Sequence, residues 1–238
     1  VERITQEHVK LLKLTIEPGK EFSIGFSDMA EKCDFLSFLR NASNFFWKKP
    51  ENEVTQEEKI EYNRHLMNKL TAIGYLLHDY KNESELKAVI VMDGKMSEVG
   101  ASNGRSGKSL MCKALEFVIP QLYIPAKSKK LTDDQFIWGE VTEKIKNIFL
   151  DDVRANIDFE FFFPLITGKL KVNPKGGLPF TLEAEDTPKL AITTNHAING
   201  EGSSFKDRQA LVAFSDYYND RHKPINDFGK NFFSEWDN

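Results

Sequence analysis

Short apolar segments recur through the second part of the chain, and most of them end in polar residues. They span residues 88–92, 122–124, 148–150, 190–192 and 210–214. A run that is apolar on both faces is typical of a strand buried inside a parallel sheet. The longer segments between these runs carry apolar residues at helical spacing. This alternation predicts an α/β domain over residues 85–238, with a parallel sheet flanked by helices.

The first 84 residues follow a different pattern and predict a small, mostly helical module. The longest helix is expected over residues 55–80, because Thr55 and Glu58 have the spacing of a capping box. A second helix is expected from Ser27-Asp28 to about Arg40. Residues 1–26 fit either a helix or a strand. The polar residues 81–84 mark the expected boundary between this module and the α/β domain.

Three other segments give local predictions. Residues 41–50 are expected to form a loop with three aromatic residues, Phe45, Phe46 and Trp47. We interpret these rings as core or interface residues, with a base-stacking platform as the alternative. Residues 136–146 predict a helix that buries Phe136, Ile137, Val141 and Ile145, and residues 159–165 predict an aromatic helix or turn.

Residues 99–110, VGASNGRSGKSL, have the composition of a phosphate-binding loop. An apolar run precedes them, and Leu110, Ala114, Leu115 and Val118 follow at helical spacing. Backbone N–H groups at the start of such a helix favour phosphate, and the lysine adds a point charge. The pattern GxxxxGK[ST] expects glycine where this chain has Ser102. The predicted ATP-binding residues are Ser102, Asn103, Gly104, Arg105, Ser106, Gly107, Lys108, Ser109 and Leu110. An ordinary Gly/Ser-rich turn with a solvated lysine is the alternative.

Two later apolar runs also end in polar residues that suit nucleotide chemistry. Asp151-Asp152 follows the run at 148–150, and Asn195 follows the run at 190–192. We expect Ser109 and Asp151 to ligate Mg²⁺, Asp152 to deprotonate or orient the attacking water, and Asn195 to hold that water. The predicted catalytic residues are Lys108, Asp151, Asp152, Asn195 and Arg208. The alternative for the two carboxylates is that they cap the next helix.

Basic residues near these motifs suggest contacts to phosphates outside the pocket. Residues 166–180 predict a β-hairpin with a basic tip at its Pro-Lys-Gly-Gly turn. Its Lys169, Lys171 and Lys175 are candidate DNA contacts, with a solvated turn as the alternative. Arg208 is a candidate arginine finger, with Lys206 as a fallback and a surface ion pair to Asp207 or Asp216 as the alternative.

Composition narrows the class of protein. The chain has a formal net charge of −4, so no global basic field favours nucleic acid, and any DNA contact must be local. The two cysteines, Cys33 and Cys112, lack metal-like spacing and suggest a reducing compartment. No apolar run approaches the ~18 residues of a membrane span, and no signal peptide is visible. We expect a cytoplasmic protein without membrane contact, and the chain looks like part of a longer protein.

Together the motifs resemble those of superfamily 3 helicases, in particular phage- and plasmid-type primase-helicases. The resemblance covers roughly residues 55–238 and depends on GKS at 107–109, IFLDD at 148–152, ITGKLKVNPKGG at 166–177 and KLAITTN at 189–195. It implies an AAA+-like core, a hexameric homo-oligomer, ATP with Mg²⁺, and single-stranded DNA in a central channel. It also implies that Lys175 lies at the channel and that Arg208 acts on a neighbouring subunit.

Two other functions remain open from the sequence. A P-loop small-molecule kinase would need an acceptor pocket and an arginine-rich lid, whereas the region after Asp152 is aromatic. A nonenzymatic nucleotide-binding or DNA-binding scaffold is the other alternative, and Ser102 favours it because the loop departs from its usual pattern.

Overall fold

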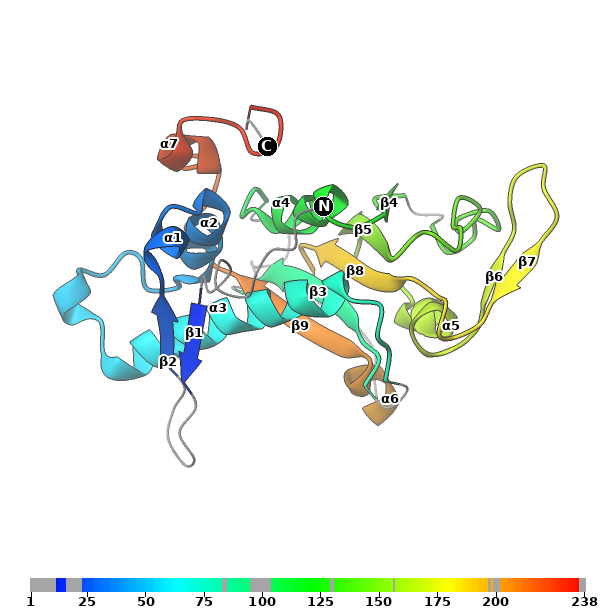
Figure 1. The fold of residues 1–238 in the computed structure, drawn as a ribbon, viewed down its shortest axis with the longest axis horizontal. Coiled ribbons are helices and arrows are strands. Elements are labelled where there is room, and N and C mark those ends of the chain that lie inside the picture. Colours follow the sequence, from blue (N-terminus) through cyan, green and yellow to red (C-terminus); the bar gives the residue numbers. More distant parts are fainter. Residues whose placement is uncertain are drawn as a thin grey trace.

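The computed structural model describes residues 12–15, 23–82, 85–94, 104–128, 131–155, 157–196, 198 and 202–235. At its centre is a five-stranded sheet in the order β4-β5-β8-β3-β9, in which every pairing is parallel. The strands are β3 (Ala88–Asp93), β4 (Gln121–Pro125), β5 (Asn147–Val153), β8 (Lys189–Thr194) and β9 (Gln209–Phe214). The predicted α/β class, with a parallel sheet flanked by helices, is confirmed (Figure 1).

The register of the sheet brings the carboxyl ends of its strands to one edge. Asp93 at the end of β3 is level with Phe214 at the end of β9, and Asp151 in β5 is level with Pro125 in β4. The central strand β8 lies between β3 and β5. The residues that follow β3, β5 and β8 in the sequence therefore meet at the same edge of the sheet.

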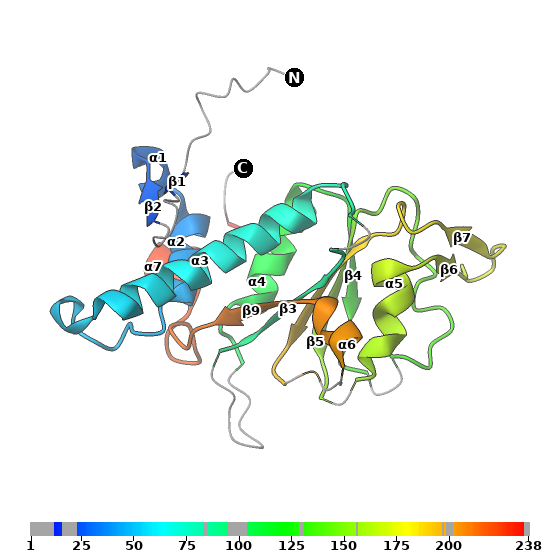
Figure 2. The same cartoon turned by 90° about the horizontal axis from the view of Figure 1, so that it is seen from below.

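Both faces of the sheet are buried, which explains why its strands are continuous apolar runs. In β3, Ala88 and Ile90 belong to one core and Val89 and Val91 to the other. The first core is closed by the 3₁₀ helix η4 (Phe159–Phe162) and by α5 (Phe163–Thr167). The second is closed by α2 (Asp34–Ser43), α3 (Gln56–Leu77) and α4 (Lys108–Lys113). Figure 2 shows α3 and α5 on different sides of the sheet.

The helices of the expected N-terminal module pack directly on the sheet. Leu39 of α2 and Leu66 of α3 share one core with Val89 of β3. The helices before the expected boundary at 81–84 and the sheet after it therefore share a continuous core. The predicted capping box is present at the start of α3, with Thr55 and Glu58 bonded reciprocally. The single helix expected from Ser27-Asp28 to Arg40 is wrong in detail: α1 (Asp28–Glu31) and α2 are separate, and α2 runs on to Ser43. Within 1–26, the described parts are the antiparallel strands β1 (Leu12–Thr15) and β2 (Ser23–Phe26).

Helix α3 covers the outer edge of β9 with polar side chains. Asn68 donates from Nδ2 to the carbonyl of Leu211 and Lys69 from Nζ to the carbonyl of Ala213, both at 2.6 Å. The Lys69 side chain is fully buried, and its ammonium lies 4.6 Å from the centre of the Phe214 ring. Burial lowers the pKa of Lys69 to about 7. These bonds satisfy edge carbonyls that would otherwise be open to pairing with another chain.

One predicted helix is wrong, and a second is present but short. Residues 136–146 form turns, and Phe136 is exposed whereas Trp138 and Val141 are buried. The Trp138 ring packs on the rings of Phe161 and Phe162, and these tertiary contacts bury Trp138 in the core. The helix after the phosphate loop is present but short. Helix α4 is followed by the 3₁₀ helix η3 (Ala114–Phe117), and Val118 is 70% exposed. The other elements are η2 (Glu51–Glu53), α6 (Ser203–Asp207) and α7 (Pro224–Phe228).

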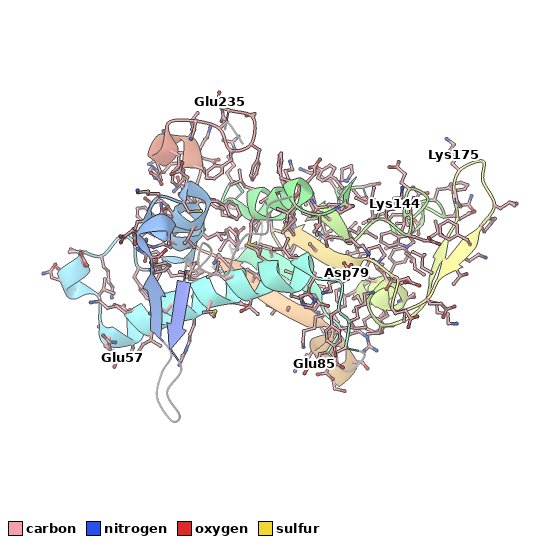
Figure 3. All side chains as sticks on the ribbon, viewed as in Figure 1. Glu57, Asp79, Glu85, Lys144, Lys175 and Glu235 are labelled. Carbon is pink, nitrogen blue, oxygen red and sulfur yellow. The ribbon has the colours of Figure 1, made fainter. Side chains whose placement is uncertain are left out.

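The predicted hairpin is present as β6 (Leu170–Val172) and β7 (Phe180–Leu182), which pair in antiparallel register. It projects from the end of the molecule opposite α1 and α2, and Lys175 lies at its tip (Figure 3). Within the described part of the chain, no helix combines the length and apolar character that crossing a bilayer requires.

Candidate functional site

The described part of the phosphate loop, residues 104–107, leads from the edge of the sheet into α4. Gly107 precedes the helix with a φ of +96°, and a Cβ there would lie 2.7 Å from the Phe38 ring of α2. Glycine is therefore required at this position both for the backbone angle and for the close approach of α2. Arg105, also at positive φ, pairs with Asp220 at 3.0 Å. Ser102 and Asn103 lie outside the described residues.

Lys108 is held by a carboxylate that the sequence analysis did not identify. Its side chain is 7% exposed, and Nζ lies 2.6 Å from Oδ1 of Asp93 at the end of β3. The Ser106 hydroxyl donates to the same Asp93 oxygen at 2.6 Å, and Lys108 donates to Ser106 at 3.1 Å. The lysine thus keeps a negative partner whose side chain is 12% exposed. The signal for Asp93 in the sequence is its place directly after the apolar run 88–92.

Asp151 receives hydrogen bonds from three different elements. Its Oδ1 accepts from the Ser109 hydroxyl of α4 at 2.5 Å and from the Thr193 hydroxyl of β8 at 2.7 Å. Its Oδ2 accepts from the Tyr123 hydroxyl of β4 at 3.2 Å. Ser109 and Asp151 therefore offer two hard oxygen ligands side by side. That donor set fits Mg²⁺, which proteins commonly hold by one or two oxygens while substrate phosphates and water complete the shell.

Asp152 has an unusual backbone for a residue in a strand. Its φ is +59°, at an irregularity in the pairing of β5 with β8. Such a conformation costs about 1 kcal/mol or more in a non-glycine residue, and it turns the carboxylate out of the strand. There Oδ1 accepts from Nδ2 of Asn195 at 3.1 Å, and Oδ2 pairs with Lys127 at 3.2 Å. The helix-cap alternative is wrong, because Asp158 caps η4 instead.

One cavity of about 670 Å³ collects most of the predicted residues. It is lined by Gly104, Arg105, Ser106, Gly107, Lys108, Ser109, Leu110, Asp151, Asp152 and Asn195. The sequence analysis missed its remaining lining, which consists of Thr193 and Thr194 of β8 and of Lys223, Pro224, Ile225, Asn231 and Phe232 near the C-terminus. Among the described residues, no cluster of three or more His, Cys, Asp or Glu side chains could cage a metal. Ser109 and Asp151, the two predicted Mg²⁺ ligands, lie side by side in this cavity.

Arg208 lies at the opposite edge of the sheet from this cavity. Its carbonyl accepts from the N–H of Ala88 at the start of β3, whereas Asp93 ends that strand. Its guanidinium donates to the Thr167 hydroxyl at 3.1 Å and to the Ser204 carbonyl at 2.9 Å. It also lies 4.5 Å from the centre of the Phe163 ring. The six residues of β3 separate its two ends by roughly 20 Å, so Arg208 at the amino end cannot reach the cavity at the carboxyl end in its own chain.

The basic residues of the hairpin form a separate group. Lys169 pairs with Glu183 across the hairpin at 2.7 Å, whereas Lys171 and Lys175 are exposed. Lys175 is labelled at the tip in Figure 3. Three further lysines, Lys127, Lys129 and Lys130, follow β4 in the sequence. Lys127 lies near the cavity through its pair with Asp152, and Lys129 and Lys130 lie outside the described residues.

The aromatic residues of the 44–50 turn contact the rest of the protein. The Trp47 indole donates to Asp216 at 2.9 Å and packs against the Tyr217 ring. The Phe45 ring lies 4.3 Å from His65 of α3. These contacts agree with the interpretation of the rings as packing residues. No protein-family model matches the chain, and no curated protein matches it either.

Proposed function

We propose that this chain is the ATP-hydrolysing motor of a DNA helicase, with an AAA+-like core of the superfamily 3 type. The observation that supports it best is the convergence of three strands on one cavity. The loop after β3 brings Lys108 and Ser109, β5 brings Asp151 and Asp152, and Asn195 follows β8. Ligands of open parallel sheets bind beyond the carboxyl ends of the strands, where these residues lie.

Each group has a role in this proposal. The backbone N–H groups at the start of α4 and the Lys108 ammonium bind the phosphates, with Lys108 exchanging Asp93 for phosphate. Ser109 and Asp151 would hold Mg²⁺, which would neutralise charge on the phosphates. Asp152 accepts the proton of the attacking water, and Asn195 holds that carboxylate through its 3.1 Å hydrogen bond. The Lys127–Asp152 pair must open first, because the Lys127 ammonium occupies Oδ2 of this carboxylate at 3.2 Å.

We also propose that the protein assembles. If Arg208 is an arginine finger, it acts on the site of a neighbouring copy, because it lies about one strand length from its own cavity. The homo-oligomer that we propose on this basis is a hexameric ring. The hairpin tip with Lys175 is then available for single-stranded DNA in the channel. Replication of a phage or plasmid in the bacterial cytoplasm is the biological setting that we propose.

The test is ATP turnover with and without single-stranded DNA, together with the molecular mass in solution with nucleotide present. We expect turnover that DNA stimulates and a mass that rises to an oligomer when ATP and Mg²⁺ are added. Stimulation by a small phosphate acceptor and not by DNA would instead indicate a kinase. Binding of ATP without turnover in the assembled protein would indicate a scaffold.

A further inference from the structure

The cavity beside the phosphate loop has two walls of different chemistry. The wall described above carries the loop, the carboxylates and Asn195. The other wall comes from the C-terminal segment, residues 223–232, which lies more than 110 residues beyond the phosphate loop in the sequence. It consists of Lys223, Pro224, Ile225, Asn231 and Phe232. The hydrolysis proposed above uses none of these side chains.

This second wall offers apolar surface to a ligand. Phe232 is 7% exposed and Ile225 is 39% exposed, and Leu110 of α4 lines the same cavity. A triphosphate is a hydrated polyanion that gains little from aliphatic or aromatic surface. The faces of a nucleobase are flat and weakly hydrated, and they stack well on such side chains. The chemistry of this wall therefore fits the nucleoside part of a nucleotide rather than its phosphates.

Contacts to α2 hold the second wall in position. Asp227 of α7 accepts from Nδ2 of Asn41 at 3.1 Å and from the Tyr218 hydroxyl at 3.0 Å. The Phe232 ring packs on Phe38 of α2, with 5.5 Å between the ring centres. The same Phe38 lies against Gly107 of the phosphate loop. Both walls thus pack on one helix, and a wall that is already in place costs a ligand little ordering entropy.

We propose that the C-terminal segment is the nucleoside-binding wall of the site. The base packs against Ile225 and Phe232, the Asn231 amide hydrogen-bonds to the edge of the base, and Lys223 faces the phosphate chain. The volume of about 670 Å³ lies in the range that accommodates a ligand of this size. The inference rests on the proposed function, because it assigns the remaining part of the same nucleotide. If it is right, changes in this segment alter the affinity for ATP but not the affinity for inorganic triphosphate, which has no nucleoside.

The experiment compares the dissociation constants of ATP and of inorganic triphosphate, each with Mg²⁺, by calorimetry on the full chain. Ile225→Ser should weaken ATP about fivefold, the effect of losing one half-buried aliphatic side chain, and leave triphosphate unchanged. Asn231→Ala should act in the same direction. Val118→Ser is the matched control, because Val118 is also β-branched and exposed but does not line the cavity. It should leave both ligands unchanged.

Each outcome bears on one of the two proposals. If Ile225→Ser and Asn231→Ala leave ATP affinity unchanged, or weaken ATP and triphosphate equally, the nucleoside wall is wrong. Lys108→Ala serves as the separate arm for the phosphate site and should weaken both ligands. If triphosphate binds equally well to Lys108→Ala and to wild type, the proposed function is at fault instead. Thermal melting of every variant shows whether it is folded; Ile225 and Asn231 are not part of the buried core.

Discussion

The protein buries two lysines in different ways, and the difference separates the proposed phosphate-binding residue from a structural one. Lys108 at the cavity is 7% exposed and lies 2.6 Å from the Asp93 carboxylate. Lys69 under α3 is fully buried, but its polar partner is the carbonyl of Ala213. The carboxylate gives Lys108 a full counter-charge, which a phosphate can replace. The carbonyl gives Lys69 only a dipole, so burial lowers its pKa to about 7. Burial alone therefore does not mark a phosphate-binding lysine.

The largest effect that tests this contrast is on turnover. Lys108→Ala should reduce ATP hydrolysis by at least about 100-fold, because the charge that meets the phosphates is removed. Steady-state hydrolysis and circular dichroism would be measured on the same preparation. Lys113→Ala is the matched control, since Lys113 is an exposed lysine on the same helix α4. Normal hydrolysis by Lys108→Ala, free of contaminating ATPase, would remove Lys108 from the site.

The next largest effect is on stability, at the partner of Lys108. Asp93→Asn leaves a buried ammonium without its counter-ion and should lower the free energy of unfolding by about 3 kcal/mol. Urea titration measures this change. Asp220→Asn is the control, since it breaks the exposed Arg105–Asp220 pair and should cost at most about 0.5 kcal/mol.

The Asp93 substitution also has a ligand readout. Inorganic triphosphate should raise the melting temperature of Asp93→Asn more than that of wild type, because it supplies the missing negative charge without first displacing Asp93. If Asp93→Asn is as stable as wild type, or gains no more than wild type from triphosphate, Asp93 is not the group that triphosphate replaces.

Lys69 should produce an effect that is smaller per pH unit than the loss from Asp93→Asn, visible in its pH dependence. Its pKa is near 7 in the folded protein and near 10.5 when unfolded, so between these values the unfolded chain binds more protons. The free energy of unfolding of the wild type should therefore rise with pH relative to Lys69→Met, by up to about 1.4 kcal/mol per pH unit. Urea titrations of both proteins from pH 7 to 9.5 give the difference. A difference that does not change with pH would mean that Lys69 stays charged in the fold.

These lysines also show what the sequence could and could not predict. The five strands were predictable, because a sheet buried on both faces requires apolar runs. Lys108 and Asp151 were predictable because local motifs encode them. Asp93 was not, since its partner follows 15 residues later and only folding brings them together. In the sequence, Lys69 looks like any polar residue of an amphipathic helix. Its burial depends on the carbonyl of Ala213 in β9, which only the fold brings next to it.

The same limit applies to the segments that were predicted wrongly. The apolar residues of 136–146 have helical spacing. In the structure Trp138 packs on the Phe161 and Phe162 rings, whereas Phe136 is exposed. The C-terminal wall of the cavity has no motif, because Ile225 and Phe232 are ordinary apolar residues whose role depends on where α2 places them. In both segments, contacts between residues far apart in the sequence determine the structure. The local pattern of apolar and polar residues does not encode such contacts.

The smallest expected effect concerns a third kind of lysine, exposed at the hairpin tip. Lys175→Ala should weaken single-stranded DNA binding a few-fold and lower the slope of log K against log salt by about 0.7, because one fewer phosphate is neutralised. Lys169→Ala should change both less, because Lys169 already pairs with Glu183 at 2.7 Å. Fluorescence anisotropy at several salt concentrations measures both variants. Since the hairpin lies outside the proposed ATP cavity, basal hydrolysis should stay the same in each. An equal loss of affinity in the two variants would indicate a general charge effect and not a specific interaction at the tip.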